Sequence, residues 1–434
     1  MLAAGVLCAC GGNTTSPLTG EPLPDVAIIV VDTLRADAVV RAETPGIDDI
    51  AQKGIRVPFA WSPSTWTAPS TLSLMTGTHV RDHGWDLPFP RFMAQAGLSY
   101  PSVDDRTTLA EVLTTHGYRT IGLFANPLLS RNLGWERGYG DWQQEHDSSM
   151  ARTLRRSVRY MKQFDPNRPL MVYLHLLGPH QPIRPSRQAA RRWGVRSETR
   201  HLSRKGIRIE HAVAGRRDNQ DQYVRAYHAQ VEDTDSKVGE LVQVMKRRGR
   251  PLLVVLTSDH GELLGEHDSW GHETSVWNAL THVPLIVSGD GLIPIPEVMT
   301  TAAIPDYITK AVGIPHQWPV SIDDQPVLVS QRDGAVAVSG DGRYRGIWDT
   351  DGATLTGVYD IVMDPDEAMA IPDFAPRAVL QMHRSHWLAE TPNNVRDALD
   401  EALDDETRSL LEELGYMGHT EADDATDPVE AVPE

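Results

Sequence analysis

Residues 26–32 read Val-Ala-Ile-Ile-Val-Val-Asp, an unbroken run of apolar and mostly β-branched residues that ends in an acid. Such a run is typical of a strand that is buried on both faces, as strands in parallel sheets are. A second run, Leu252–Thr257, leads directly into Ser258-Asp259-His260-Gly261. Both runs therefore predict strands of one buried sheet, with polar residues just past their carboxyl ends.

Strands and helices alternate along most of the chain. Apolar runs predict further strands at Thr120–Phe124, Leu170–Leu177 and Val283–Val287, and helical patterns cover Ile47–Lys53, Leu109–Thr115 and Gln222–Met245. This alternation argues for a doubly wound α/β sheet flanked by helices. We expect one large α/β domain over residues 23–325, with its ligand at the carboxyl ends of the strands.

The pattern changes past residue 325. Short alternating runs predict antiparallel strands at Ala335–Ser339, Gly342–Asp349 and Thr354–Ile361, followed by helices at Leu380–Leu388 and Val395–Leu403. These features predict a small α+β subdomain over residues 326–418. The last fourteen residues hold six acids and no base, which indicates a disordered acidic tail over 419–434.

Composition limits the possible functions. The 434 residues are 40% hydrophobic and 23% charged, which is typical of a globular protein and not of a disordered one. The net charge of −18 argues against nucleic acid as a partner. Both cysteines, Cys8 and Cys10, lie in the first ten residues, so we expect no disulfide in the folded body.

The first 22 residues resemble the leader and tether of a bacterial lipoprotein. The apolar run Leu2–Ala9 is followed by Cys10, which would carry the lipid, and then by small polar residues. This interpretation places the protein in the bacterial cell envelope, on the membrane through a lipid anchor. The alternative is a frayed apolar N-terminus. Elsewhere no apolar run approaches the roughly 18 residues that a membrane-spanning helix needs.

Asp32, Asp259 and His260 are candidate metal ligands. A carboxylate directly after a buried strand is unfavourable unless a cation compensates it. For Asp32 that cation could be a metal ion or the side chain of Arg35, and the residues alone leave both open. His260 could likewise be an ordinary loop histidine. Two carboxylates and one imidazole suit Zn, Mn or Fe better than Ca.

Thr67-Ala68-Pro69-Ser70 predicts the start of a helix that runs to Gly77, because Pro suits the first helical position. Thr67 would then lie at a helix N-terminus, where N–H groups and the helix dipole favour an anion. The alternative is that Thr67 only caps the helix.

Three histidines and a basic segment are candidates for substrate contacts. His180 and His272 lie in predicted loops and could protonate a leaving oxygen or hold an anion. Residues 184–217 carry eleven Lys or Arg against two acids, which fits either a solvated insertion or a basic lip that attracts an anionic substrate. The candidate substrate-binding residues are His175, Arg184 and Arg187.

Several short motifs follow one another in a fixed order: Val30–Asp37, Thr44–Asp48, Thr67–Gly77, Tyr173–His180, Thr257–His272, Val283–Ile286, Tyr359–Glu367 and Leu414–Tyr416. The ordered set resembles the sulfatase family of the alkaline phosphatase superfamily, over about residues 25–418. The resemblance implies an alkaline-phosphatase-like fold and a metal-dependent enzyme that cleaves sulfate or phosphate esters.

Residue by residue, the resemblance assigns roles to the candidates. Asp32, Asp259 and His260 match metal-ligand positions, and Thr67 matches the nucleophile, whose oxygen would be a fourth metal contact. His180 and His272 match groups that bind the transferred anion or assist the leaving group. We expect one divalent metal, because the arrangement typical of two-metal members is absent from the sequence.

Three departures distinguish this chain from ordinary sulfatases. Their nucleophile is a Cys or Ser that is oxidised to formylglycine, and Thr67 cannot form that aldehyde. Thr71 replaces the Arg of the motif, and Thr33 and His260 stand where Asp and Asn are common. Together these changes resemble the Thr-nucleophile pattern of phospho-ester hydrolases and transferases.

Three functions therefore remain open. The favoured one is a metal-dependent hydrolase of phosphate or phosphonate esters, with a phospho-group transferase acting on an envelope glycan or lipid as its variant. The second is a sulfatase that works without formylglycine, and the third is a non-catalytic anion-binding lipoprotein. The expected partner is an anionic ester linked to a glycan or lipid, and the sequence does not predict an oligomeric state.

Overall fold

The computed structural model describes residues 15–85, 106–130, 134–196, 207, 217–272, 275–324, 328–332, 334–350, 353–372 and 374–394. The expected lipidation site Cys10, the helix at Val395–Leu403 and the tail at 419–434 lie outside the described residues, as does most of the basic segment beyond residue 196. Within the described part, no helix has the length and apolar character needed to cross a bilayer.

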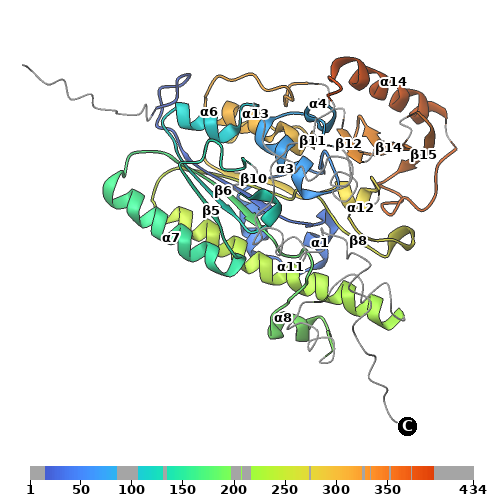
Figure 1. The fold of residues 1–434 in the computed structure, drawn as a ribbon, viewed down its shortest axis with the longest axis horizontal. Coiled ribbons are helices and arrows are strands. Elements are labelled where there is room, and N and C mark those ends of the chain that lie inside the picture. The colour runs from blue at the N-terminus through green and yellow to red at the C-terminus, as the bar shows by residue number, and fades with distance from the viewer. Residues whose placement is uncertain are drawn as a thin grey trace, which may run out of the picture.

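A seven-stranded sheet lies at the centre, with strand order β2-β10-β7-β1-β6-β4-β5 (Figure 1). Its strands are β1 (Asp25–Val31), β2 (Gly54–Arg56), β4 (Arg119–Phe124), β5 (Asp141–Gln144), β6 (Leu170–Leu176), β7 (Leu252–Thr257) and β10 (Leu285–Gly289). β1 pairs in parallel with β6 and with β7, and all seven of its residues are buried. The two runs that predicted a buried parallel sheet are neighbouring strands of it.

The sheet is mixed, because β10 runs antiparallel to both β7 and β2. The run at Val283–Val287 predicted this strand without its direction. The only α-helix described between β7 and β10 is the four-residue α12 (Asn278–Thr281). A parallel neighbour usually needs a crossover helix that packs across the sheet, and the described residues between β7 and β10 contain no such helix, which suits an antiparallel strand.

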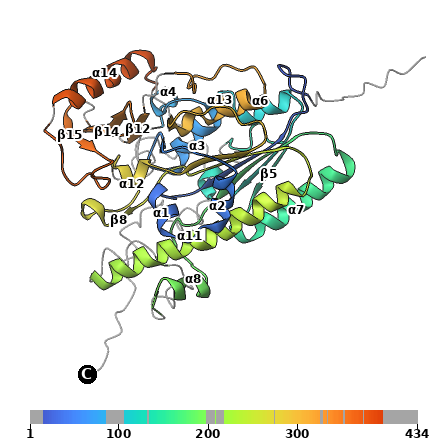
Figure 2. The same ribbon diagram turned by 180° about the vertical axis from the view of Figure 1, so that it is seen from behind.

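Helices cover both faces of the sheet, as the doubly wound prediction requires (Figures 1 and 2). Alternate residues of a strand point to opposite faces. Val26, Ile28 and Val30 pack in one core with α3 (Thr67–Thr76), α6 (Leu109–Thr115) and α13 (Ile304–Ala311). Ala27, Ile29 and Val31 pack in the other with α1 (Ala36–Arg41), α2 (Pro45–Gln52), α7 (Asp147–Phe164), α8 (Arg187–Arg192) and α11 (Arg217–Lys246).

Short elements complete the α/β body. They are α4 (Val80–His83), the pair β3 (Phe59–Trp61) and β11 (Val298–Thr300), the pair β8 (Leu263–Leu264) and β9 (Trp270–Gly271), and the 3₁₀ turns η1 (Pro127–Leu129), η3 (Glu266–Asp268) and η4 (Thr301–Ala303). The β8–β9 hairpin follows the Asp259-His260 loop directly, so it lies next to the predicted site.

The C-terminal part is a separate four-stranded antiparallel sheet with one packed helix (Figure 1). It contains β12 (Leu328–Arg332), β13 (Ala335–Ser339), β14 (Tyr344–Trp348), β15 (Leu355–Asp360) and α14 (Phe374–Glu390). The three strands and the helix expected at Leu380–Leu388 are present, and β12 is an additional strand on one edge. The α+β prediction for this part of the chain is confirmed.

A buried ion pair joins this small sheet to the α/β body. Arg345 on β14 pairs with Glu367, and both side chains are essentially inaccessible to solvent. Arg345 also donates to Thr281 Oγ1 at 2.9 Å, and Glu367 Oε2 accepts the N–H of Asn278 at 2.6 Å. The pair therefore holds the loop that includes α12 against the C-terminal sheet.

Replacing Arg345 by Met is expected to lower the free energy of unfolding by roughly 3–5 kcal/mol, because Glu367 would remain as a buried charge without its partner. Denaturant titration followed by circular dichroism measures this loss.

Arg343→Met is the matched control, because Arg343 directly precedes β14, is 46% exposed and pairs with Asp360. It should have little effect. Equal losses in the two variants would show that the buried pair does not stabilise the fold.

Candidate active site

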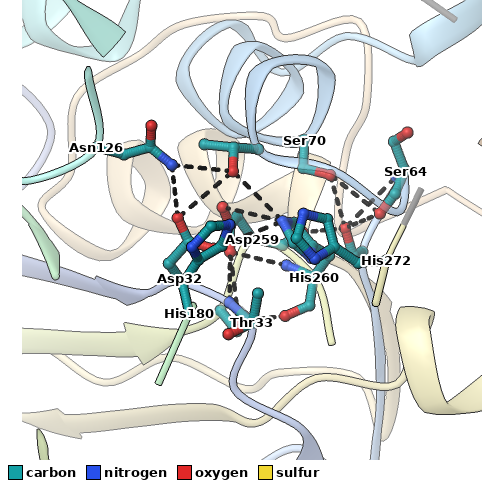
Figure 3. Close-up of polar contacts among 12 residues, drawn as sticks. Asp32, Thr33, Ser64, Ser70, Asn126, His180, Asp259, His260 and His272 are labelled. Carbon is teal, nitrogen blue, oxygen red and sulfur yellow. Dashed lines mark hydrogen bonds and ion pairs between the residues drawn. The ribbon is translucent and has the colours of Figure 1, made fainter. Parts of the chain in front are cut away.

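The candidate residues gather at the carboxyl ends of four neighbouring strands. Asp32 follows β1 directly, Asp259 follows β7, and His175 lies near the end of β6. Asn126 follows β4, the next strand along. Figure 3 shows Asp32, Asp259, His260 and Asn126 pointing toward one another. Parallel strands bring these residues together because their carboxyl ends meet at one edge of the sheet.

The side chains form a compact buried cluster. One ligand atom each of Asp32, His175 and Asp259 lie within 4.8 Å of one another. His260 Nε2 is 3.6 Å from both Asp32 Oδ1 and Asp259 Oδ2, and His175 Nε2 is 3.4 Å from Asp259 Oδ2. None of the four is more than 1% exposed. The structure thus brings the three predicted metal ligands together and adds His175, which the sequence suggested only as a substrate contact.

Lone pairs in this cluster face each other. His260 Nδ1 is 2.9 Å from the carbonyl oxygen of Gly261, so Nδ1 carries the hydrogen and Nε2 presents a lone pair. Asp32 Oδ1 and Asp259 Oδ2 are buried and accept no hydrogen bond from any described residue. Carboxylate oxygens and an imidazole lone pair repel one another at this distance unless a cation lies between them.

These residues fit a divalent transition metal. Tetrahedral bonds of about 2.0–2.1 Å place ligand atoms roughly 3.4 Å apart. Three of the separations are 3.4–3.6 Å, and the ligand atoms of Asp32, His175 and Asp259 all lie within 4.8 Å of one another. Carboxylate and imidazole ligands together suit Zn, Mn or Fe, whereas Ca prefers an all-oxygen shell. The donors are compatible with a metal site, and the identity of the metal stays a prediction.

Burial and mutual charge interactions shift the pKa values of the cluster in different directions, and Asp259 together with Asp32 raises the pKa of His175 in spite of its burial. Burial lowers the pKa of His260 to about 4, so its imidazole is neutral. Burial and the nearby Asp259 carboxylate raise the pKa of Asp32 well above its usual range. For Asp259 burial acts in the same direction, but His260 and His175 outweigh it and hold the pKa below its ordinary value. A bound cation would favour the ionised form of both carboxyl groups.

Asp32 has no ion pair with Arg35, so that alternative is wrong. Arg35 instead pairs with Asp37 at 2.8 Å and with Glu266 at 2.6 Å. Asp32 accepts a hydrogen bond from Asn126 Nδ2 at 2.8 Å. Arg35 therefore does not compensate the Asp32 carboxylate.

Thr67 points into the cluster. Its Oγ1 is 3.4 Å from Asp32 Oδ2, 3.4 Å from His260 Nε2 and 3.3 Å from Asn126 Nδ2. The helix α3 begins at Thr67 itself and not at Pro69, and Trp66 occupies the N-cap position. The alternative that Thr67 only caps the helix is therefore wrong, because its hydroxyl contacts the cluster.

The loop after β1 is strained in a way that supports the site. Thr33 has φ of 57°, a left-handed conformation that is unusual for a β-branched residue. Its N–H donates to Asp259 Oδ1 at 3.3 Å, and its carbonyl oxygen accepts from Tyr227 OH at 2.7 Å. These contacts compensate the strain and orient Asp259.

His180 and His272 lie together beside the cluster (Figure 3). Their rings are 5.1 Å apart, and the His272 ring is 4.5 Å from that of His260. His272 Nδ1 faces Glu262 Oε2 at 3.1 Å, and burial raises the pKa of Glu262 to about 7. His180 Nδ1 contacts the carbonyl oxygen of Gln181, which leaves Nε2 as the nitrogen that can exchange a proton.

Sequence reasoning missed Asn126 and gave Glu262 no role. Asn126 could have been found by its position, because it follows a predicted strand at the same edge of the sheet. Of the two expected substrate-binding arginines, Arg184 lines a cavity that also contains His180, whereas Arg187 is exposed at the start of α8 and does not line it.

Comparison with known proteins identifies a family. Residues 24–308 match the sequence profile described as Sulfatase. The chain is 32% identical over 94 residues to arylsulfatase K of Bos taurus, covering 20% of this chain and 17% of that protein. It is 22% identical over 339 residues to choline-sulfatase of Rhizobium meliloti (strain 1021), covering 64% of each chain.

A third relative has a transferase name. The low-salt glycan biosynthesis sulfotransferase Agl7 of Haloferax volcanii is 25% identical over 306 residues, which cover 66% of this chain and 60% of that protein. In all three relatives the matched segment spans less than two thirds of the relative's length.

Solved structures share the fold at low identity. A phosphonate monoester hydrolase of Agrobacterium radiobacter superposes with a TM-score of 0.60 at 15% identity, covering 84% of this chain and 95% of that one. A protein solved in complex with its substrate D-glucosamine-2-N,6-O-disulfate gives a TM-score of 0.62 at 16% identity, covering 85% and 97%.

The cluster predicts that the purified protein binds one Zn or Mn per chain, and that Asp259→Asn weakens this binding by about 100-fold or more because a charged ligand is lost. Metal analysis after dialysis and the rise of the melting temperature with metal concentration measure the affinity.

Asp49→Asn is the control, because Asp49 is 44% exposed on α2, where it pairs with Lys53 and Lys246. His175→Gln separates two roles: a ligand role weakens metal binding, whereas a substrate contact raises KM and leaves metal binding unchanged. Undiminished binding in Asp259→Asn would contradict the assignment.

Proposed function

Because this chain belongs to the sulfatase family, we propose that it is a metal-dependent hydrolase of phosphate or phosphonate esters, acting through a covalent ester on Thr67. The observation that carries this proposal is the place of Thr67 Oγ1, 3.4 Å from both Asp32 Oδ2 and His260 Nε2 at the start of α3. A hydroxyl in this position can be activated as a nucleophile. Sulfate esters are the less favoured substrates of the same site.

The choice of phosphate over sulfate rests on how the enzyme ester is cleared. In a formylglycine hydrate, a second hydroxyl group lies on the carbon that carries the sulfate. When this hydroxyl loses its proton, a C=O bond forms and the C–O bond to sulfate breaks. A threonyl ester has no second hydroxyl, so water must attack the transferred group itself. Phosphorus accepts such in-line attack when its oxygens are neutralised. Thr67 therefore favours a phosphoryl or phosphonyl group.

A bound cation would have two roles in this reaction. Asp32, Asp259, His260 and His175 would hold it, and it would supply Lewis-acid neutralisation of the ester oxygens together with a lower pKa for the Thr67 hydroxyl. The N-terminus of α3 adds further positive potential at the same place.

The protein's own residues then account for both halves of the reaction. Thr67 Oγ1 attacks phosphorus while its proton passes to Asp32 Oδ2, the acceptor at 3.4 Å, and the bond to the leaving oxygen breaks. His180 Nε2 or His272 Nε2 gives the leaving oxygen its proton. A water molecule next attacks phosphorus and returns a proton to that histidine. Cleavage of the threonyl bond returns the Asp32 proton to Oγ1.

The substrate and location belong to the same proposal. Support for a glycan-linked ester comes from the structural neighbour bound to a disulfated glucosamine and from the relative named for glycan biosynthesis. The leader sequence before residue 23 supports an exported lipoprotein of the bacterial envelope, anchored through Cys10.

A transferase is the second candidate, and the relative named a sulfotransferase favours it. In this variant an acceptor hydroxyl replaces water in the second half of the reaction. The basic segment that begins at Arg184 would help to bind an anionic donor or acceptor.

Thr67→Ala is expected to lower kcat on 4-nitrophenyl phosphate by about 10⁴-fold or more, since the nucleophile is lost. Thr67→Ser should retain much of the activity, because it keeps the hydroxyl. Parallel assays with 4-nitrophenyl sulfate and bis(4-nitrophenyl) phosphate rank the ester classes. Full activity in Thr67→Ala would rule out the covalent route, and faster cleavage of the sulfate would reverse the preferred ester.

His180→Ala and His272→Ala test leaving-group protonation. An alkyl phosphate needs a proton on its leaving oxygen, whereas 4-nitrophenolate leaves without one. We expect the histidine that donates the proton to cost about 10²–10⁴-fold on the alkyl ester and far less on the nitrophenyl ester.

His116→Ala is the control, because His116 lies at the end of α6 and its Nδ1 faces the carbonyl oxygen of Val112 in the same turn. Equal losses on both esters in both histidine variants would exclude an acid role for either.

A further inference from the structure

A cavity of about 300 Å³ lies beside His180, past the carboxyl ends of β4 and β6. Ala125 and Pro127 line it, and Asn126 between them donates to Asp32 and to Thr67. The cavity therefore adjoins both the nucleophile's hydrogen-bond partner and a candidate proton donor. A leaving group that took its proton from His180 would enter this space.

Lys237 of α11 offers a cation to the cavity. Its Nζ is 3.4 Å from Asp147 Oδ2, and its side chain is 29% exposed. This separation is longer than the roughly 2.7–2.9 Å of a strong charge-assisted hydrogen bond. Asp147 already accepts the N–H groups of Leu177 at 2.9 Å and Gly178 at 3.1 Å. Lys237 consequently keeps N–H donors for a ligand.

Gln230, also on α11, offers a buried amide. Its Oε1 accepts the N–H of Arg184 at 3.1 Å, whereas its Nε2 donates to no residue in the described part of the chain. Gln230 as a whole is only 8% exposed, so its side chain is held in the wall of the cavity. A Cβ atom at Gly178 would come within 3.0 Å of this Nε2, so the glycine leaves room for the amide. The cavity wall thus contains an amide donor that can bind a ligand's oxygen.

The lining has a positive balance in an acidic protein. Of the lining residues that the structure describes, Arg184 and Lys237 carry positive charge and Asp147 carries negative charge, while the whole chain carries −18. A ligand that complements these donors is rich in oxygen acceptors and carries a negative charge. At about 300 Å³ the cavity is at the small end of ordinary ligand sites, roughly 300–1,000 Å³, which suits one sugar-sized group.

We propose that this cavity is a specificity subsite for the leaving alcohol, and that the alcohol is a sugar-sized polyol with an anionic group of its own. Lys237 and the amide of Gln230 bind that second anion while His180 meets the leaving oxygen. The inference rests on the proposed hydrolase function, because it identifies the substrate class of the same site. It predicts preference for esters of acidic sugars over esters of neutral ones.

Two phosphate esters test the preference directly. Sorbitol 6-phosphate and 6-phosphogluconate differ at the far end of the chain, where CH₂OH in the first is a carboxylate in the second. We expect kcat/KM for 6-phosphogluconate to exceed that for sorbitol 6-phosphate by about tenfold or more, since a charge-assisted contact is gained. Lys237→Met should reduce this ratio to near one.

The ratio within each variant is the readout, so partial loss of active protein does not affect it. Lys246→Met is the matched control, because Lys246 lies at the end of the same helix, 40% exposed and 3.7 Å from Asp49. Its ratio should equal that of the unmodified protein. Gln230→Glu is the second variant. It keeps the acceptor for the N–H of Arg184, removes the amide donor and adds a negative charge that repels the carboxylate. Its kcat/KM ratio should therefore also be lower than that of the unmodified protein.

Failure of this inference differs from failure of the proposed function. If 4-nitrophenyl phosphate is cleaved but the ratio is near one, or is unchanged in Lys237→Met and Gln230→Glu, the subsite is wrong and the hydrolase stands. If no ester is cleaved, the proposed function fails, and the subsite is then tested by measuring the binding of gluconate and of sorbitol. Binding of gluconate but not sorbitol, lost in Lys237→Met, supports the subsite, and equal or absent binding overturns it.

Discussion

Lone pairs of Asp32, Asp259 and His260 face one another where water does not reach, and this arrangement is the constraint on which the site depends. Removing a carboxylate from water costs several kcal/mol even after the protein relaxes. Two carboxylates that are at most 1% exposed and 3.6 Å from the same imidazole nitrogen are therefore unfavourable without a shared cation. The sheet creates this arrangement, because β7, β1 and β6 are adjacent and end at the same edge.

Hydrogen bonds from the surrounding structure hold the cluster in place although its lone pairs repel one another. Ser258 Oγ contacts the carbonyl oxygens of Val31 and His260, which ties the ends of β1 and β7 together. Ser62 Oγ contacts the carbonyl oxygen of Asp259, and the carbonyl of Ser62 accepts from Ser330 of the C-terminal sheet. Two successive hydrogen bonds thus connect Ser330 of the C-terminal sheet to the backbone of Asp259. The role of this sheet extends beyond covering the α/β body.

Sequence patterns were sufficient where burial alone decides the structure. Continuous apolar runs located β1 and β7, and alternation located β13 from Ala335 to Ser339. The helix α7 was missed because its eighteen residues are mostly polar, although Met150, Leu154, Val158 and Met161 recur at helical spacing on its buried side. The direction of β10 could not be predicted, because strand composition does not encode which neighbour a strand pairs with.

The site was predicted in part for a similar reason. Strand-end position located Asp32 and Asp259, and it could have located Asn126. The place of His175 among the carboxylates depends on the register of β6 against β1, where His175 lies opposite Val30. Register is a property of paired strands and cannot be obtained from one strand alone. The same applies to the subsite near Lys237, which requires α11 to pack against the loop after β6.

A crystal structure of the protein prepared with Zn or Mn, with diffraction recorded at the metal's absorption edge, tests the central claim most directly. We expect one anomalous peak at about 2.0–2.2 Å from ligand atoms of Asp32, Asp259 and His260, with Thr67 Oγ1 beside it. Whether His175 lies at the same distance settles its role. A metal held by other residues, or metal-containing crystals with no peak at the cluster, would contradict the account.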